Sequence, residues 1–305
     1  PQEYELRRPY NRMFHRFTDF IQRRNLIALA VLLKEIESLP SKGIKAILEG
    51  TFCSTLNWAC RMCVLKKRSP AAWASANYWT QNVFLEINVW NSFSNRFKAT
   101  LKGKEYSKNY LGGYPRQAKS FKELQESRNF LLFTKSAASL AEIPSNSVDV
   151  IITDPPYGGN VMYSELSNFY AIWVKETLGI QPDALIDDAE EAIVSKPHNK
   201  TLKDYRNLMQ RTFKECRRVL KPNGWMVMTF HNREFKVWSA IHLAAHDAGF
   251  IWSEKDGMIY QPPIQQYTTT IYQYRAGSML GDFIPSYRKA ETLPEERWIE
   301  EAEIG

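Results

Sequence analysis

The chain has 305 residues, enough for one large domain or two modest ones with a sizeable apolar core. Its four cysteines are too few for a disulfide-stapled secreted protein, and its longest apolar run, residues 26–33, is too short to span a membrane. We therefore expect a protein of the reducing cytoplasm. The net charge of +7 comes from the first 125 residues, which hold 21 Lys and Arg against 9 Asp and Glu. This balance suits a polyanionic partner, with a solvated basic face as the alternative.

Residues 1–115 are predicted to form a basic, aromatic-rich and mostly helical segment. Apolar residues at helical spacing predict one helix from about residue 14 to Ser38 and a second over residues 44–64. The basic run 98–108 is predicted to be flexible. A cluster of Gly, Tyr and Pro at residues 110–115 marks the end of the segment.

One Cys-x-x-Cys pair, Cys60 and Cys63, lies inside the second predicted helix. A zinc ribbon needs a second such pair or added histidine ligands, and no second pair follows. We therefore interpret both residues as buried thiols. No metal site is expected here, or in the acidic stretch 183–191.

From residue 116 to residue 289 the pattern predicts an α/β region. Residues 148–153 form a short, β-branched run almost without alternation, which is typical of a buried parallel strand. A short strand is also predicted at 129–133, and an acidic tail at 290–305. The remaining predicted elements are helices at 163–178, 205–220 and 235–249, a strand at 225–230, and antiparallel last strands at 250–253 and 268–274.

The strand at 148–153 runs directly into Asp154-Pro155-Pro156-Tyr157. Two consecutive prolines forbid both helix and strand ladder, so the chain leaves the sheet here with a stiff backbone. The motif therefore lies at the carboxyl end of a strand, where open α/β sheets bind their ligands. The Asp154 carboxylate and the Pro155 carbonyl can accept both N–H groups of an exocyclic amine and free its lone pair to attack a methyl sulfonium. Tyr157 can stack on the base.

This motif resembles the signature of S-adenosylmethionine-dependent amino-methyltransferases. Residues 153–173 are similar to DNA methylases in which Asp-Pro-Pro-Tyr is followed by Asn-Val, Tyr and an aromatic helix. Residues 217–224 resemble the turn before the fifth strand of such enzymes. The resemblance implies a Rossmann-like class I methyltransferase sheet, S-adenosylmethionine as cofactor, DNA as substrate, and a role in restriction-modification or phage defence. Residues 116–289 would be the catalytic region, and residues 1–115 a DNA-contacting or accessory segment.

Site residues follow from the same resemblance and from the strand ends. The predicted catalytic residues are Asp154, Pro155, Pro156 and Tyr157. Ser136 and Ala137 match a loop that meets the cofactor adenine, together with Asp154, although the acidic residue often found in that loop is missing. His231 and Asn232 follow the strand at 225–230, so we expect neighbours of the active site there, not a general base. The predicted substrate-binding residues are Tyr157, Asn160, Tyr163, His231 and Asn232.

The glycine-rich loop that holds the methionine end of the cofactor in these enzymes is not visible in the sequence. Three accounts stay open: a fragment or split enzyme whose second chain carries the loop, a permuted order, and a non-catalytic DNA-binding subunit. Asp at position 154 favours adenine N6 over cytosine N4 as the target. Guanine N2 in RNA is an alternative, whereas glutamine methyltransferases usually carry Asn at this position.

Overall fold

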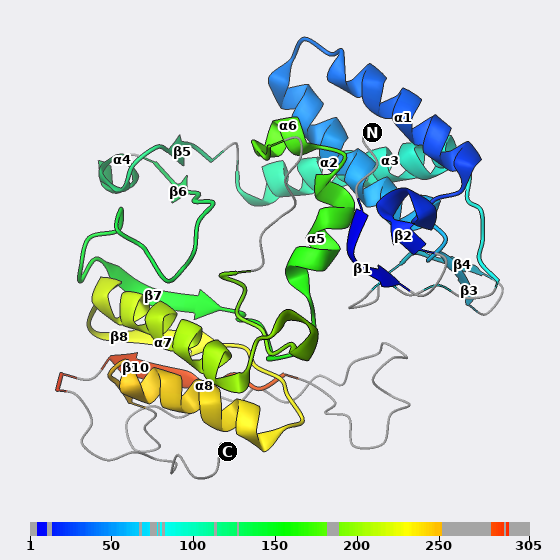
Figure 1. Ribbon diagram of the computed structural model, residues 1–305. Coiled ribbons are helices and arrows are strands. Elements are labelled where there is room, and N and C mark those ends of the chain that lie inside the picture. Colours follow the sequence, from blue (N-terminus) through cyan, green and yellow to red (C-terminus); the bar gives the residue numbers. More distant parts are fainter. Residues whose placement is uncertain are drawn as a thin grey trace. The chain divides into compact units, whose positions relative to one another are not determined.

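The computed structural model describes residues 5–10, 14–66, 69–73, 78, 80, 83–112, 115–126, 128–181, 189–251, 282–289 and 291–292. The chain divides into two compact units (Figure 1). Unit 1 comprises Pro1–Tyr114 and Met162–Ala189, and unit 2 comprises Pro115–Val161 and Glu190–Gly305. The chain thus leaves unit 1 near the predicted boundary and returns to it once. The division into functional domains stays a prediction, and almost all of the predicted acidic tail lies outside the described residues.

Unit 1 is mostly helical, as predicted for the N-terminal segment. Its helices bury aromatic side chains against one another: Phe20, Phe52 and Phe169 are fully buried. Its elements are β1 (Glu5–Tyr10), β2 (Phe14–Arg16), a 3-10 turn (Phe17–Phe20), α1 (Arg23–Glu37), α2 (Lys42–Ala59), β3 (Val64–Lys66), β4 (Ser69–Ala71), α3 (Val89–Tyr110), α5 (Tyr163–Ala171) and α6 (Lys175–Leu178).

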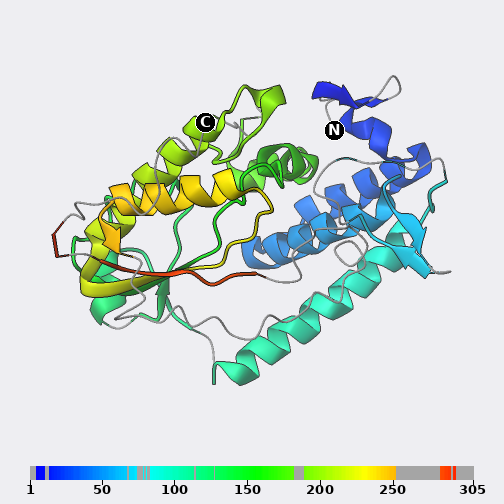
Figure 2. The same cartoon turned by 90° about the horizontal axis from the view of Figure 1, so that it is seen from below.

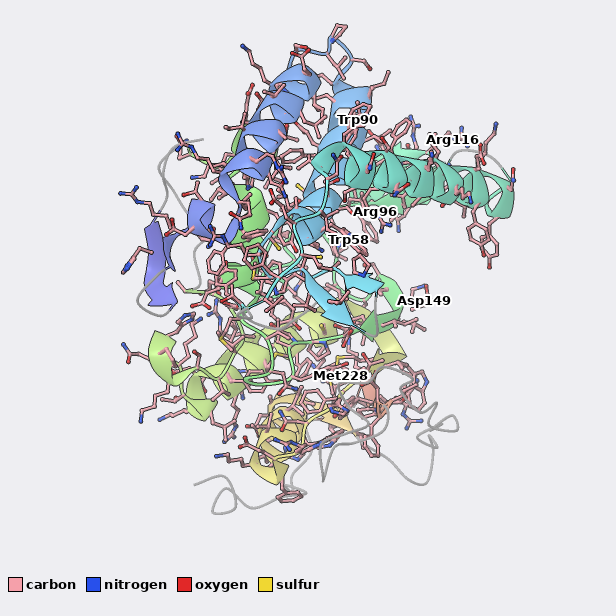
Figure 3. The ribbon with its side chains drawn as sticks, turned by 90° about the vertical axis from the view of Figure 1, so that its right-hand side faces the viewer. Trp58, Trp90, Arg96, Arg116, Asp149 and Met228 are labelled. Atoms are coloured by element: carbon pink, nitrogen blue, oxygen red, sulfur yellow. The ribbon has the colours of Figure 1, made fainter. Side chains whose placement is uncertain are left out.

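Three predictions for unit 1 are wrong in detail. The first helix begins at Arg23, because Phe14–Arg16 pairs with β1 as a strand. The second helix ends at Ala59, so Cys60 and Cys63 lie in the turn after it. Residues 98–108, predicted to be flexible, belong to the 22-residue helix α3 (Figures 2 and 3). Their high charge was read as flexibility, although Lys is a good helix former.

Unit 2 contains a four-stranded mixed sheet in the order β7-β8-β10-β9. β7 (Val148–Thr153) and β8 (Leu220–Met228) are parallel, and β10 (Ser286–Lys289) is antiparallel to β8 and to β9 (Phe250–Ile251). This confirms the predicted α/β class with a methyltransferase-like sheet. The predicted strand at 268–274 lies outside the described residues, and β10 was not predicted. The other elements are β5 (Gln117–Ala118), α4 (Phe121–Glu126), β6 (Phe130–Leu131), a 3-10 turn (Lys196–His198), α7 (Leu202–Val219) and α8 (Phe235–Asp247).

Helices α7 and α8 cover one face of this sheet (Figures 1 and 2). Both helices lie close to their predicted bounds. Phe213 and Ile241 pack in one cluster with Met226 and Met228 of β8 and with Tyr287 of β10, all of them fully buried. The core of unit 2 is therefore on this side, and it supports the strands whose ends carry the motif.

The other face of β7 is open among the described residues. Val150 is 50% exposed and Ile152 is 81% exposed, and β7 pairs there with β8 alone. The prediction of a buried strand is thus wrong for this face, although the predicted parallel pairing is confirmed. The physical reason is that β7 stands at the end of the described strand order, with α7 and α8 on its opposite face.

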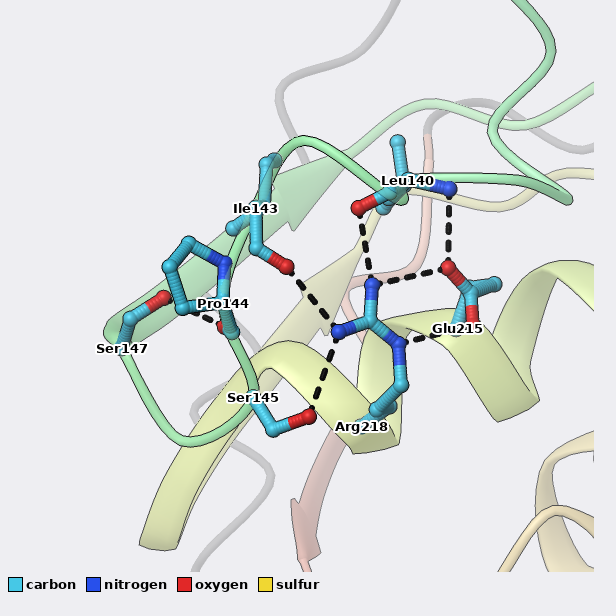
Figure 4. Close-up of polar contacts among 7 residues, drawn as sticks. All are labelled: Leu140, Ile143, Pro144, Ser145, Ser147, Glu215 and Arg218. Carbon is cyan, nitrogen blue, oxygen red and sulfur yellow. Dashed lines mark hydrogen bonds and ion pairs between the residues drawn. The ribbon is translucent and has the colours of Figure 1, made fainter. Parts of the chain in front are cut away.

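Arg218 near the end of α7 fixes the segment that leads into β7 (Figure 4). Its guanidinium donates to the carbonyls of Leu140 at 2.8 Å and Ile143 at 2.9 Å. It also donates to both carboxylate oxygens of Glu215 at 2.9 Å, and Glu215 accepts from the Leu140 amide at 2.8 Å. The Arg218 bonds lower the pKa of the Glu215 carboxyl. This arginine therefore sets the position from which β7 begins.

Candidate active site

The candidate site lies where the two parallel strands end. β7 ends at Thr153, which is paired with Met228 at the end of β8. One further bond continues the ladder, because the Thr229 amide donates to the Thr153 carbonyl at 3.0 Å. The motif at 154–157 and the segment 229–232 therefore leave the sheet side by side, at its ligand-binding edge.

Asp154 is exposed, and two hydroxyl groups hold its carboxylate. Tyr157 Oη donates to Asp154 Oδ1 at 2.6 Å, and Thr229 Oγ1 donates to the same oxygen at 2.8 Å. Burial and the bond to Asp154 raise the pKa of the Tyr157 hydroxyl, so it stays protonated as a donor at neutral pH. Both bonds use Oδ1. The carboxylate is thereby oriented without using Oδ2 for these contacts.

Two side-chain hydrogen bonds to backbone carbonyls hold the loop that carries the motif. The buried Tyr205 of α7 donates from Oη to the Pro156 carbonyl at 2.7 Å. Asn232 donates from Nδ2 to the Tyr157 carbonyl at 2.9 Å. Neither bond uses the Pro155 carbonyl, which is the second acceptor that the amine chemistry requires. The loop is thus held by side chains while the Asp154 carboxylate remains exposed.

Steric contacts explain why the two residues after Tyr157 are glycines. Gly158 has φ +65°, and a Cβ there would lie 3.0 Å from Val237 Cγ1 and 3.3 Å from Asn232 Nδ2. A Cβ on Gly159 would lie 2.7 Å from the Val194 carbonyl oxygen, too close for any side chain. The backbone of the loop therefore packs directly against segments 194 and 232–237, and only glycine permits it.

His231 and Asn232 are both buried beside the motif. The Asn232 side chain is engaged at both ends, since its Oδ1 accepts from the Glu234 amide at 2.7 Å. The His231 ring lies 6.3 Å from the Tyr157 ring, and its Nδ1 is 3.8 Å from Asp282 Oδ1. Asn232 thus supports the loop in the structure, and the substrate-binding role predicted for His231 and Asn232 stays a prediction.

The other predicted site residues lie outside this group. Ser136 and Ala137 are exposed, and in the described part of the chain no hydrogen bond joins them to the motif; Ser136 Oγ accepts from the Ala138 amide at 3.3 Å. Asn160 is exposed in the loop just after the glycines. Tyr163 begins α5 and belongs to unit 1. The cofactor and substrate roles of these four residues stay predictions.

Two residues that support the candidate site were missed by the sequence reasoning. Thr229 directly orients the Asp154 carboxylate, and Tyr205 holds the Pro156 peptide. Thr229 had a usable signal, because it lies at the carboxyl end of the strand next to the motif, two residues before the noted His231. Tyr205 had none, since a tyrosine on the apolar face of a helix is indistinguishable from a core residue.

The described residues outside the candidate site include the Cys-x-x-Cys pair. Cys60 and Cys63 are buried, as predicted, and burial raises the pKa of the Cys60 thiol to about 12. Across the described ranges, no group of three or more His, Cys, Asp and Glu side chains could hold a metal ion. Within the same ranges, no helix is long and apolar enough to cross a membrane.

A mixed sheet with Asp-Pro-Pro-Tyr at the carboxyl end of a parallel strand defines the class of Rossmann-like amino-methyltransferases. Residues 148–289 match the family model described as DNA methylase, the N6/N4 methyltransferases. The matched region is just under half of the chain, and the match confirms the resemblance noted at the motif. The match begins at the first residue of β7 and ends at the last residue of β10.

Solved structures similar to the chain include TTHA0409 of Thermus thermophilus, a candidate DNA modification methylase, at 16% identity and a TM-score of 0.27. The alignment covers 54% of this chain and 56% of that one. A structure of TTHA0409 complexed with S-adenosyl-L-methionine aligns at 15% identity over 54% of each chain, again with a TM-score of 0.27. The chain thus spans about half the length of these structures. No curated protein matches it.

Proposed function

We propose that this protein transfers a methyl group to the exocyclic amine of a base flipped out of DNA, with adenine N6 as the target. The observation that carries the proposal is the Asp154 carboxylate, oriented by Tyr157 and Thr229 at the carboxyl end of β7. The DNA methylase family of residues 148–289 supports DNA as the substrate. Asp at position 154 is the reason for adenine over cytosine.

The chain's own residues account for binding and activation of the amine. Asp154 Oδ2 and the Pro155 carbonyl accept its two N–H groups, and the Tyr157 ring stacks on the base. With both N–H groups held, the nitrogen lone pair is directed away from the ring and forms the new N–C bond as the donor's S–C bond breaks. The extra proton passes to Asp154 and from there to water, because the carboxylate is exposed. Catalysis is then chiefly orientation and fixed electrostatics.

The methyl donor of this class is S-adenosylmethionine, which supplies a methyl sulfonium when bound. The described residues fit the amine side of such a site through Asp154 and Tyr157. For the donor side we propose Ser136 and Ala137 at the cofactor adenine, with Asp154 nearby, because their segment follows the short strand β6 and is exposed. The glycine-rich loop for the methionine end has no counterpart in the sequence.

We further propose that a second polypeptide segment supplies this loop, on another chain or on a longer form of this one. The support is β7, whose exposed Val150 and Ile152 lie on a strand with one described neighbour. Parallel strands are normally buried on both faces, so an added strand with a covering helix would complete the sheet. Unit 1 would contact DNA. We place the activity in the cytoplasm, since all four cysteines are free thiols.

The test is transfer of tritiated methyl from S-adenosylmethionine to DNA, with and without the neighbouring reading frames supplied as a second polypeptide. We expect labelling of adenine N6 that requires the second polypeptide. Labelling of RNA alone would instead assign guanine N2 in RNA. DNA binding without any labelling, under both conditions, would leave the non-catalytic DNA-binding subunit as the function.

A further inference from the structure

Helix α3 in unit 1 has two halves with different surroundings. Its first half is anchored: Asn88 caps it, Val89 and Phe93 are buried, and Thr100 Oγ1 lies 3.2 Å from Thr51 Oγ1 of α2. Its last ten residues, 101–110, are all exposed. The helix is therefore anchored at its N-terminal end, and the side chains at its C-terminal end are exposed.

The second anchor is a cation–π contact between helices. The Arg96 guanidinium lies over the Trp58 ring of α2 at 5.4 Å, and Figure 3 shows the two side chains between their helices. The contact adds to buried Val89 and Phe93 in setting which side of α3 faces α2. The side chains beyond Arg96 are thereby presented in one defined arrangement.

The exposed half is strongly basic. Between residues 97 and 110 the sequence has four lysines and one acidic residue, Glu105. The lysines form two pairs spaced by four residues, so each pair lies along one side of the helix. They are Lys98, Lys102, Lys104 and Lys108. Like charges at this spacing weaken an isolated helix, so the pattern is not one that helix stability favours.

Two exposed tyrosines accompany the lysines. The Tyr106 and Tyr110 rings are stacked, with centroids 5.9 Å apart and an interplanar angle of 16°, and they are 69% and 78% exposed. They bury little against the protein, so core packing does not explain them. Arg and Lys are the main hydrogen-bond donors to the phosphate oxygens of DNA, and tyrosine hydroxyls donate to them regularly as well.

We propose that α3 is a DNA-backbone-binding helix, with Lys98, Lys102, Lys104 and Lys108 contacting phosphates and Tyr106 and Tyr110 lying against the sugar-phosphate chain. The inference rests on the proposed function for the identity of the nucleic acid, and it names the contact surface. From Lys98 to Lys108 the helix rises about 15 Å. Duplex DNA carries one phosphate per about 1.7 Å of its axis, so several phosphates lie within reach of this length.

The test compares two full-length variants that each lose four lysine charges. The first replaces Lys98, Lys102, Lys104 and Lys108 with Gln, which has similar helix propensity. The matched control replaces Lys119, Lys122, Lys203 and Lys214, which are exposed in unit 2 on α4 and α7 or just before α4. Binding of a fluorescent duplex is measured by anisotropy from about 50 to 200 mM salt. Circular dichroism checks that both variants keep the wild-type helix content.

We expect the α3 variant to bind DNA at least about tenfold more weakly at moderate salt, with a slope of log K against log salt shallower by about 2 to 4. The control should stay within about twofold of wild type. Equal losses in both variants would overturn the inference, because net charge alone would then explain binding. So would tighter binding of wild type to an RNA duplex of the same sequence. Wild type that binds DNA but transfers no methyl even with the second polypeptide present would contradict the proposed function and leave the inference on α3 intact.

Discussion

The two faces of the β7–β8 sheet differ sharply although they belong to the same strands. On one face α7 and α8 bury Met226 and Met228 completely, whereas on the other Ile152 is 81% exposed. Apolar composition alone does not distinguish the two, since the strands carry apolar side chains on both faces. The difference lies in what covers them. One face is a finished hydrophobic core, and on the other the described residues leave the apolar side chains of Val150 and Ile152 exposed.

The largest effect is expected at the carboxyl end of β7, where the proposed function places the amine. Asp154→Ala should lower methyl transfer about a thousandfold, about 4 kcal/mol, because it removes the oriented acceptor for the amine. DNA binding should stay near wild type. Tritiated methyl transfer measures the first quantity and anisotropy the second.

Asp149 supplies a matched control, since it is an exposed aspartate of the same strand, near the opposite end. It pairs with Lys221 at 2.6 Å, far from the motif along the strand. Asp149→Ala should leave methyl transfer within about twofold. Retained activity in the Asp154 variant would refute the catalytic role.

The faces themselves are compared by truncating one residue on each. Met226→Ala, on the covered face, should lower the free energy of unfolding by about 3 kcal/mol, because it leaves a cavity under α7 and α8. Ile152→Ala should cost less than about 0.5 kcal/mol in this chain alone, since its side chain is already in water. Urea unfolding gives both values. Similar costs would mean that Ile152 is covered.

A pH titration probes the covered face. Burial lowers the pKa of His242 to about 4, and its Nδ1 lies 2.8 Å from Tyr287 Oη. The unfolded chain binds a proton at about pH 6.5, which the folded chain rejects until about pH 4. Stability is therefore complete above the unfolded value and falls as the pH drops, by about 2 kcal/mol between pH 7 and pH 5.

The measurement is urea unfolding at both pH values in wild type and in His242→Phe. The variant should lose this part of the pH dependence, even if its stability at pH 7 is lower. An unchanged pH dependence would show that another group is responsible.

A smaller effect on catalysis is expected at Thr229. Thr229→Val removes one of the two hydroxyls that orient Asp154 and should lower kcat about tenfold, about 1.4 kcal/mol, with little change in KM for DNA. Thr229→Ser keeps the hydroxyl and should restore most of the rate. Equal losses in both variants would point to packing and not to the hydrogen bond.

Much of unit 2 could be predicted because its signals are local. The apolar run before Asp154, the turn at 217–224 and the amphipathic pattern of α7 each fix an element from a few neighbouring residues. What failed depends on distant partners. Exposure of Ile152 depends on which segments lie against β7, and the bond of Thr229 to Asp154 joins residues 75 positions apart.

In unit 1 the errors came from reading charge and spacing without context. The lysines of α3 were taken as a sign of flexibility, yet the helix is set by the Asn88 cap and by buried Val89 and Phe93. Cys60 and Cys63 were placed in a helix that ends one residue earlier. These errors do not affect the predicted fold class or the predicted position of Asp154 at the end of a strand, because both rest on the strand and turn patterns of unit 2.

The chain returns to unit 1 at Met162–Ala189, and this return affects when unit 1 can fold during synthesis. Phe169 lies 6.4 Å from Phe20 and 5.1 Å from Trp73, and Trp173 lies 5.5 Å from Phe52, all measured between ring centroids. Unit 1 therefore cannot close its aromatic core until residue 173 has left the ribosome. By then β7 has emerged but β8 has not. A nascent chain would thus complete the core of unit 1 before β8 is available to pair with β7. A fragment ending at residue 115 would expose Phe20, Phe52 and Trp73.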